Sequence, residues 1–271
     1  MKSKARKRGS PVRKARDFVE DRLAEGRAAF AIEELLDETG LSLVAANNQL
    51  RRLGDRVRRV SRPQSFFLIV DPPHRAIGAP PPAWWLDDYF RWLGRPYYLA
   101  LLSAAELYGA APQAVQVHQV MTDRPRREIS VGRVRIRFFV KHEVQQTPVG
   151  QPAGAHAPLR VSTREATALD LVAYAARIGG IERAHETLVP LLSRMRATEL
   201  RKALDAQNKR LAAQRLGYLL ERAGAERLAA AVDKWLPAAR FWCSLTAGRK
   251  NQSREHGSPR WRVSVDAKGE W

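Results

Sequence analysis

The chain has 271 residues, enough for two domains of ordinary size or for one domain with a small appended module. Hydrophobic residues make up 45% of the sequence, which is sufficient for packed cores, and the formal net charge is +19. This charge favours nucleic acid or another polyanion as a partner, although an arginine-rich composition makes many proteins basic without that function.

The cysteine count and the lack of signal-peptide and membrane-helix patterns indicate where in the cell the protein is found. Cys243 is the single cysteine, so an internal disulfide is impossible, which fits a reducing environment. No run approaches the ~20 apolar residues of a membrane helix, and no apolar segment of a secretory signal follows the basic first residues. We therefore expect a cytoplasmic protein.

The first elements are predicted between residues 1 and 53. Residues 1–11 are rich in lysine and arginine, and we expect a basic arm there that either contacts phosphates or only aids solubility. An apolar stripe predicts a first helix from residue 12 to about residue 25. Two short helices follow; the first ends at Gly40, and the second is capped by Ser42 and ends near Leu53.

Two strands are predicted after these helices, at 57–60 and 66–70. Helices followed by a hairpin are the order of a winged helix-turn-helix, so residues 12–70 are expected to form one DNA-binding domain. The alternative is a small helical subdomain with a solvated polar helix. The hairpin favours the DNA interpretation because it concentrates arginines where phosphates would lie: Arg56, Arg58, Arg59 and Arg62.

The helix that begins after Ser42 is expected to have an apolar and a polar face. At ~100° per residue, Leu43, Ala46, Leu50 and Leu53 are predicted to point inward. The opposite face carries small residues, amides and guanidinium groups; amides can pair with adenine and guanidinium groups with guanine. Base contacts are predicted for Ala45, Asn48, Gln49 and Arg52. Backbone contacts are predicted for Ser42, Arg51, Arg56, Arg58, Arg59 and Arg62.

A stretch rich in proline and glycine at 71–82 breaks regular structure and predicts a linker. The remaining residues, 83–271, are expected to form a second domain. Its predicted segments are helices at 83–93 and 96–108, strands between 114 and 149, mostly helices from 163 to 236, and possible strands at 241–245 and 260–265. The predicted fold class is α+β, with an N-terminal winged helix-turn-helix followed by a mixed α/β domain whose C-terminal half is mostly helical.

Arginines alternate with apolar residues between positions 133 and 138. This period of two predicts a strand with one buried face and an exposed row formed by Arg133, Arg135 and Arg137. Two interpretations of this row are open: a solvated sheet face, or a basic surface that contacts an acidic partner or nucleic acid.

Catalytic and metal-binding patterns are incomplete in this sequence. His142-Glu143 and His185-Glu186 lack the second histidine of a zinc-binding HExxH helix. A glycine-rich phosphate loop and a nucleophile elbow are missing. Gly257-Ser258 could open a nucleotidyltransferase site, but the paired aspartates that such a site needs do not follow. We expect no enzymatic activity, no cofactor and no bound metal.

Several segments match a known family in their order and separation: 102–109, 161–172, 179–181, 215–221 and 260–263. Together with the predicted winged module, they give a chain that resembles the AbiEi-type antitoxins of bacterial abortive-infection toxin–antitoxin systems. The resemblance covers nearly the whole sequence after the basic arm.

The resemblance implies two functions that serve phage defence. The N-terminal domain would bind inverted repeats in its own promoter and repress the operon, as a monomer in solution or as two copies on DNA. The C-terminal domain would neutralise a cognate nucleotidyltransferase-like toxin, by direct contact or by a functional effect, and its toxin interface is unknown. One departure concerns the turn of the wing, where such proteins usually carry a glycine and this chain has Pro63-Gln64-Ser65, which leaves the role of Arg62 open.

Two other classes of function remain. One is a winged-helix transcription factor whose C-terminal domain senses a ligand or oligomerises, without a toxin partner. The other is an enzyme acting on nucleic acid. A nucleotidyltransferase-like gene in the adjacent reading frame would favour the antitoxin, and metal-dependent turnover of nucleic acid by the pure protein would favour the enzyme.

Overall fold

The computed structural model describes residues 14–60, 65–111, 113–246 and 253–265. The chain divides into two compact units. Unit 1 comprises Met1–Gly94, Ile129–Arg135 and His156–Pro158, and unit 2 comprises Arg95–Glu128, Ile136–Ala155 and Leu159–Trp271. The predicted basic arm, 1–11, and Arg62 lie outside the described residues.

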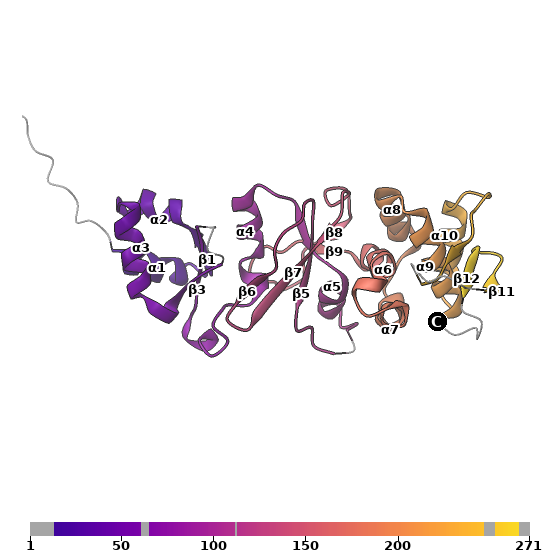
Figure 1. Cartoon of the computed structure of the whole chain (residues 1–271), viewed down its shortest axis with the longest axis horizontal. Coiled ribbons are helices and arrows are strands. Elements are labelled where there is room, and N and C mark those ends of the chain that lie inside the picture. The colour runs from indigo at the N-terminus through magenta and orange to yellow at the C-terminus, as the bar shows by residue number, and fades with distance from the viewer. Residues whose placement is uncertain (1–13, 61–64, 112, 247–252, 266–271) are drawn as a thin grey trace, which may run out of the picture. The chain divides into compact units, whose positions relative to one another are not determined.

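Unit 1 begins with three helices and three strands. In chain order they are α1 (Ala15–Ala24), β1 (Ala29–Ala31), α2 (Ile32–Thr39), α3 (Leu43–Arg52), β2 (Val57–Arg59) and β3 (Phe66–Ile69). β3 lies between β1 and β2 and is antiparallel to both. In Figure 1 the three helices gather beside these strands. The short 3-10 turns of this unit are Gly54–Arg56, Pro72–His74 and Pro82–Trp84.

Aromatic rings hold the helices of unit 1 to its strands. Phe30 contacts Phe18 edge to face, with centroids 5.1 Å apart, and stacks on Phe67 at 5.5 Å. Ala46 and Leu50 of α3 are buried in the same core, as predicted. The inward position predicted for Leu43 is wrong, since its side chain is 53% exposed. Leu43 is the first residue of α3 and lies beyond the stretch of that helix that meets the core.

Unit 1 extends beyond the proline-rich stretch. Helix α4 (Leu86–Leu93) places Tyr89 and Trp92 against Phe66, with ring centroids 5.3 and 5.4 Å apart. The units divide after Gly94, whereas the sequence prediction placed a linker at 71–82. The prolines do interrupt regular structure, but the aromatic face of α4 returns to β3 and joins unit 1. The segment with β6 (Ile129–Val131) also belongs to unit 1.

Five strands of a six-stranded mixed sheet lie wholly or mostly in unit 2. They are β4 (Tyr97–Leu99), β5 (His118–Thr122), β7 (Val134–Val140), β8 (Val149–Gly150) and β9 (Val161–Ser162), in the spatial order β7-β5-β4-β9-β8. β5 is antiparallel to β4 and parallel to β7. The helix predicted at 96–108 is wrong in its first part, because Tyr97–Leu99 form β4 and the helix begins at Leu101. Aromatic residues suit a half-buried strand better than a helix interior.

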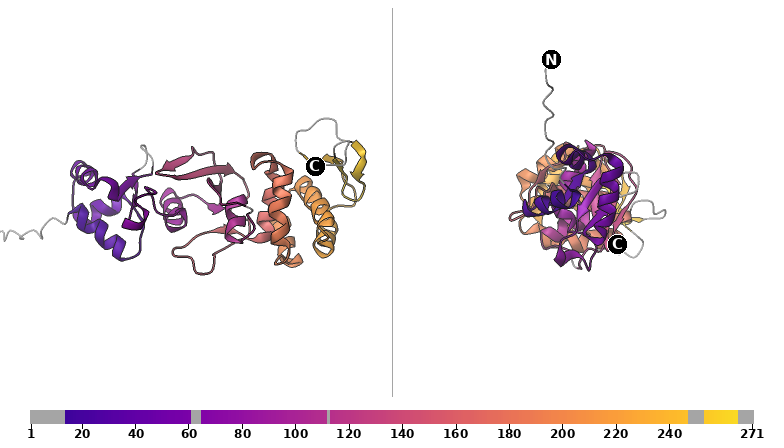
Figure 2. Two further views of the ribbon diagram at one scale, coloured as in Figure 1. Left: turned by 90° about the horizontal axis from the view of Figure 1, so that it is seen from below. Right: turned by 90° about the vertical axis from the view of Figure 1, so that its left-hand side faces the viewer.

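Helices and a small second sheet complete unit 2. The helices are α5 (Leu101–Leu107), α6 (Arg164–Ala173), α7 (Ile181–Leu192), α8 (Ala197–Gln207), α9 (Arg210–Arg222) and α10 (Glu226–Trp235), with a 3-10 turn at Ala175–Arg177. The second sheet has the order β10 (Cys243–Ser244), β12 (Val263–Val265) and β11 (Ser253–Ser258). Figure 2 shows its yellow strands beside the orange helices of the same unit. The predicted α+β composition is therefore confirmed.

A buried polar cluster joins the sheet of unit 2 to α6. The Lys141 ammonium lies 2.7 Å from a carboxylate oxygen of Asp170 and donates to the Tyr98 hydroxyl at 2.9 Å. Tyr98 donates to the second oxygen of Asp170 at 2.8 Å. The Lys141 and Asp170 side chains are 0% exposed. Asp170 is therefore an internal counterion of Lys141.

Candidate nucleic-acid interface

Helix α3 is fixed at its start by capping. Gly40 has φ 67°, a left-handed conformation that suits glycine, and it ends α2. Ser42 then accepts a hydrogen bond from the Ala45 amide at 3.3 Å and so caps α3, as the sequence predicts. α3 carries no acidic residue in its first turn and two arginines, Arg51 and Arg52, in its last. The N-terminal end of α3 is therefore positive through its dipole and the C-terminal end through side chains.

Gln49 has an internal role. Its side-chain oxygen accepts a hydrogen bond from the Ala15 amide at the start of α1, at 2.9 Å. This bond satisfies an amide at the N-terminal end of α1 that has no partner within that helix. The side chain therefore ties α3 to α1, and its amide oxygen is not available to a base. The base contact predicted for Gln49 does not fit this geometry.

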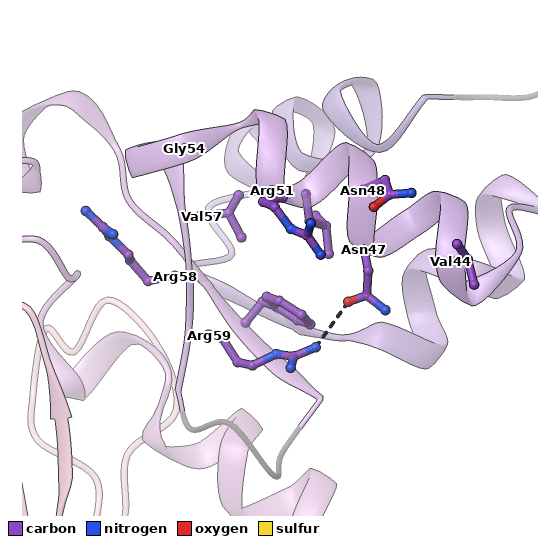
Figure 3. Close-up of a pocket in the computed structure, with 10 residues that line it drawn as sticks. Val44, Asn47, Asn48, Arg51, Gly54, Val57, Arg58 and Arg59 are labelled. Carbon is purple, nitrogen blue, oxygen red and sulfur yellow. Dashed lines mark hydrogen bonds between the residues drawn. The ribbon is translucent and has the colours of Figure 1, made fainter.

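The exposed face of α3 and strand β2 line one groove of about 750 Å³ (Figure 3). Positions 44, 47, 48 and 51 lie on this side of the helix because residues three or four apart share a face. The groove is lined by Val44, Asn47, Asn48, Leu50, Arg51, Gly54, Val57, Arg58, Arg59 and Phe67. Four of the predicted residues are thus brought together: Asn48, Arg51, Arg58 and Arg59.

Val44 and Asn47 line this groove although no DNA contact was predicted for either of them. Val44 is 71% exposed, an unusual degree for an apolar side chain near the start of a helix. Ala45, by contrast, is half-buried and does not line the groove, and Arg52 is exposed outside it. The observed face is rotated by about one residue from the predicted one, a shift of ~100°. The rotation follows from the contact of Gln49 with Ala15, which turns Gln49 away from the groove. The two residues are 34 positions apart in the sequence, so local patterns do not reveal this contact.

The arginines of the hairpin are not equivalent. Arg59 donates to the side-chain oxygen of Asn47 at 3.1 Å, and its guanidinium lies 5.0 Å from the centroid of Phe67. Arg58 is exposed and extends away from Asn47 in Figure 3. Arg56 is half-buried and pairs with Glu20 of α1 at 3.1 Å. Arg16 and Arg56 lower the pKa of the Glu20 carboxyl, so Arg56 has a structural partner in addition to any phosphate.

The arginine row of β7 has the predicted alternation. Val134 and Ile136 are buried, and the arginines at 133, 135 and 137 are exposed. Arg137 pairs with Glu128 at 3.2 Å, and both side chains are substantially exposed. The partner of this row, if it has one, stays a prediction.

Two of the sequence segments behind the family resemblance meet in unit 2. Gly217 of α9 lies directly beneath the Trp261 ring, where a Cβ would come within 2.1 Å of a ring carbon. The indole N–H of Trp261 donates to Glu221 at 2.7 Å, and Arg215 donates to the Ser244 carbonyl at 2.7 Å. The apolar residues of this α9 segment pack in the core of unit 2, with Leu216, Leu219 and Leu220 all 0% exposed.

Chemistry-bearing residues outside these clusters are dispersed. No group of three or more His, Cys, Asp or Glu side chains that could hold a metal lies within the described residues. Burial lowers the pKa of His185, and burial raises the pKa of the Cys243 thiol. In the part of the chain that the structure describes, no helix is both long and apolar enough to span a bilayer.

Comparison with known proteins gives one family match within the chain. Residues 98–222 match the family model of the AbiEi antitoxin C-terminal domain, which confirms the resemblance to AbiEi-type antitoxins and supports an antitoxin role in a toxin–antitoxin system. No curated protein matches the chain. The crystal structure of the RV2827C protein from Mycobacterium tuberculosis is similar in fold, with a TM-score of 0.65, 18% sequence identity and coverage of 94% of each chain.

Proposed function

We propose that the protein is a cytoplasmic, non-enzymatic antitoxin that also represses its own operon. Unit 1 is assigned as a winged helix-turn-helix, with α3 as the helix that enters the major groove and the β2–β3 hairpin as the wing. The observation that carries this assignment is the groove in which exposed amides and arginines of α3 meet Arg58 and Arg59 of β2. Such a combination suits base edges and the phosphates beside them.

The antitoxin role rests on the family match of residues 98–222. The cognate toxin is proposed to be nucleotidyltransferase-like, as the resemblance implies. For autoregulation, two copies of unit 1 would bind the two halves of an inverted repeat in the promoter.

The DNA assignment is tested by fluorescence anisotropy with the full chain and its own promoter. Asn48→Ala is expected to cost about 1–3 kcal/mol of specific binding, because a base contact is lost. Arg52→Ala, for which a base contact was also predicted, should cost less because Arg52 lies outside the groove. Arg58→Ala should weaken binding to every sequence and lower the salt slope by about 1, since it removes one phosphate contact.

Arg201→Ala is the matched control for these variants. Arg201 is an exposed arginine of α8 in unit 2, paired with Asp205 at 3.1 Å. Its removal should leave promoter binding and the salt slope unchanged. If Asn48→Ala and Arg58→Ala bind the promoter like the parent protein, the assignment of the groove is wrong.

The antitoxin role is tested by co-expression with the toxin encoded next to this gene. Growth should be restored by the full chain and by the Arg58→Ala variant, because neutralisation is assigned to unit 2. Continued growth arrest in cells that contain soluble full-length protein would exclude the role.

One observation favours a second candidate, a transcription factor that senses a ligand. Unit 2 has a pocket of about 500 Å³, within the range of small-molecule sites, where the ends of α7 and the starts of α8 and α10 meet. A small molecule that alters promoter binding in the absence of any toxin gene would favour this candidate.

A further inference from the structure

Two adjacent asparagines of α3 have different surroundings. The Asn47 amide nitrogen donates to the Leu43 carbonyl at 2.9 Å, and its oxygen accepts from Arg59 at 3.1 Å. The side chain of Asn48 is exposed and makes no hydrogen bond within the described residues. An asparagine needs both its donor and its acceptor to pair with adenine. Both groups of the Asn48 side chain are free for a base, whereas each group of the Asn47 side chain already has one partner.

Asn47 instead links the helix to the wing. The Arg59 guanidinium is held by the Asn47 oxygen on one side and by the face of Phe67 on the other. Phe67 is itself 5% exposed and stacked on Phe30, so this support is rigid. A guanidinium held in this way loses less side-chain freedom when it binds a phosphate, which strengthens the contact.

Val44 and Arg51 complete the face around Asn48. They lie four residues before it and three residues after it, so the three side chains follow one line along the helix. The helix rises 1.5 Å per residue, which separates neighbours in this line by about 4.5–6 Å. Successive base pairs rise about 3.4 Å. Three side chains on this line therefore match positions within about four base pairs of the major groove.

The chemistry of each side chain selects one base. An exposed branched apolar side chain suits the methyl group of thymine, a free carboxamide suits the N6 and N7 atoms of adenine, and a guanidinium suits the O6 and N7 atoms of guanine. The side chain of Arg51 is exposed and makes no hydrogen bond within the described residues, so its guanidinium donors are available.

We propose that Val44, Asn48 and Arg51 determine the operator sequence by contacting a thymine methyl, an adenine and a guanine, and that Asn47 is a positioning residue that holds Arg59 for a phosphate. This inference rests on the proposed DNA-binding function and refines it. It assigns opposite roles to two adjacent and chemically identical side chains.

The test uses the full chain and promoter fragments with single-atom changes. Operator positions are first located by footprinting, and thymine is then replaced by uracil, adenine by 7-deazaadenine and guanine by 7-deazaguanine, one site at a time. At the adenine and guanine sites the parent protein should lose about 5- to 150-fold in affinity, equivalent to about 1–3 kcal/mol. Loss of the thymine methyl should cost about fourfold, the worth of one buried methylene-sized group.

Each variant should become insensitive to one replacement. Asn48→Ala should no longer distinguish adenine from 7-deazaadenine, Arg51→Ala should no longer respond to 7-deazaguanine, and Val44→Ala should no longer respond to uracil. These residues are on the surface, so their variants are expected to fold, which circular dichroism and thermal melting verify.

The Asn47 and Arg59 variants are compared by their affinity for the promoter and for unrelated DNA. Asn47→Ala and Arg59→Ala should weaken binding to every sequence to a similar degree, and the double variant should add little to either single variant. Sensitivity to 7-deazaadenine should be kept in Asn47→Ala. Loss of that sensitivity in Asn47→Ala and its retention in Asn48→Ala would overturn the inference while leaving DNA binding intact. Failure of the parent protein to bind any promoter fragment would overturn the proposed function as well.

Discussion

The groove of unit 1 and the buried cluster of unit 2 place charged and polar side chains in opposite ways. In the groove of α3 and β2, the side chains of Asn48, Arg51 and Arg58 are exposed. In unit 2, Lys141 and Asp170 are fully buried and satisfy each other. Under the proposed function, the exposed polar groups of the groove contribute to binding, whereas the buried Lys141–Asp170 pair contributes to folding. Substitutions should therefore have separate effects in the two units.

The largest effect is expected from Asp170→Asn. The substitution leaves the buried Lys141 ammonium without its counterion and should cost about 3–5 kcal/mol of the free energy of unfolding, measured by urea denaturation. Burial lowers the pKa of Lys141 while Asp170 raises it, so part of the loss is relieved at high pH when the lysine becomes neutral.

A double variant separates the charge from the packing. Lys141→Met with Asp170→Leu removes both charges and should recover most of the lost stability. Arg201→Ala, which breaks an exposed ion pair, should cost no more than about 1 kcal/mol. A small effect of Asp170→Asn, comparable to that of Arg201→Ala, would contradict the contrast between the units.

A smaller loss is expected from Gly217→Ala. The added Cβ would overlap the Trp261 ring, and displacement of a buried ring should cost about 1–3 kcal/mol of unfolding free energy. Gly150→Ala is the control, because no heavy atom lies within 4 Å of its Cβ position. Promoter binding should be unchanged under conditions in which the protein is folded, and a specific loss of DNA affinity would show that the units are coupled.

Ser42→Ala tests how much the N-terminal cap of α3 stabilises unit 1. Loss of the cap should cost about 1 kcal/mol of the free energy of unfolding, measured by thermal melting. Ser42→Asp keeps an acceptor for the Ala45 amide and should retain that stability. Equal melting temperatures for Ser42→Ala and the parent would indicate that tertiary packing alone fixes the start of the helix.

The smallest effect concerns pH. Burial lowers the pKa of His118 below its ordinary value of 6.5, and Glu106 opposes this shift. The unfolded chain therefore takes up a proton before the folded chain does as the pH falls through 6.5, so the free energy of unfolding decreases below that pH. In His118→Gln, the slope of stability between pH 7 and pH 5 should be shallower. The two proteins should differ by a constant amount above pH 7.

Local signals predicted much of both units. Gly40 and Ser42 were identified from the sequence as the end of one helix and the cap of the next, and both have these roles in the structure. The exposed arginines of β7 followed from a period of two. Such features depend on residues a few positions apart, so the sequence is sufficient to find them.

Features that depend on distant partners could not be predicted. Strand β1 has the sequence Ala-Phe-Ala, which carries no strand signal, and it forms because β3 pairs with it. Asp170 and Lys141 are 29 residues apart, and neither position shows that its charge will be buried. The same limitation misplaced the groove-lining side of α3, because the contact of Gln49 with α1 sets the orientation of that helix.

The hydrogen bond between Gln49 and the Ala15 amide has a mechanical consequence. α3 cannot turn about its own axis without releasing the first amide of α1. A rotation of α3 therefore either carries the start of α1 with it or breaks this hydrogen bond, at a cost of about 1 kcal/mol.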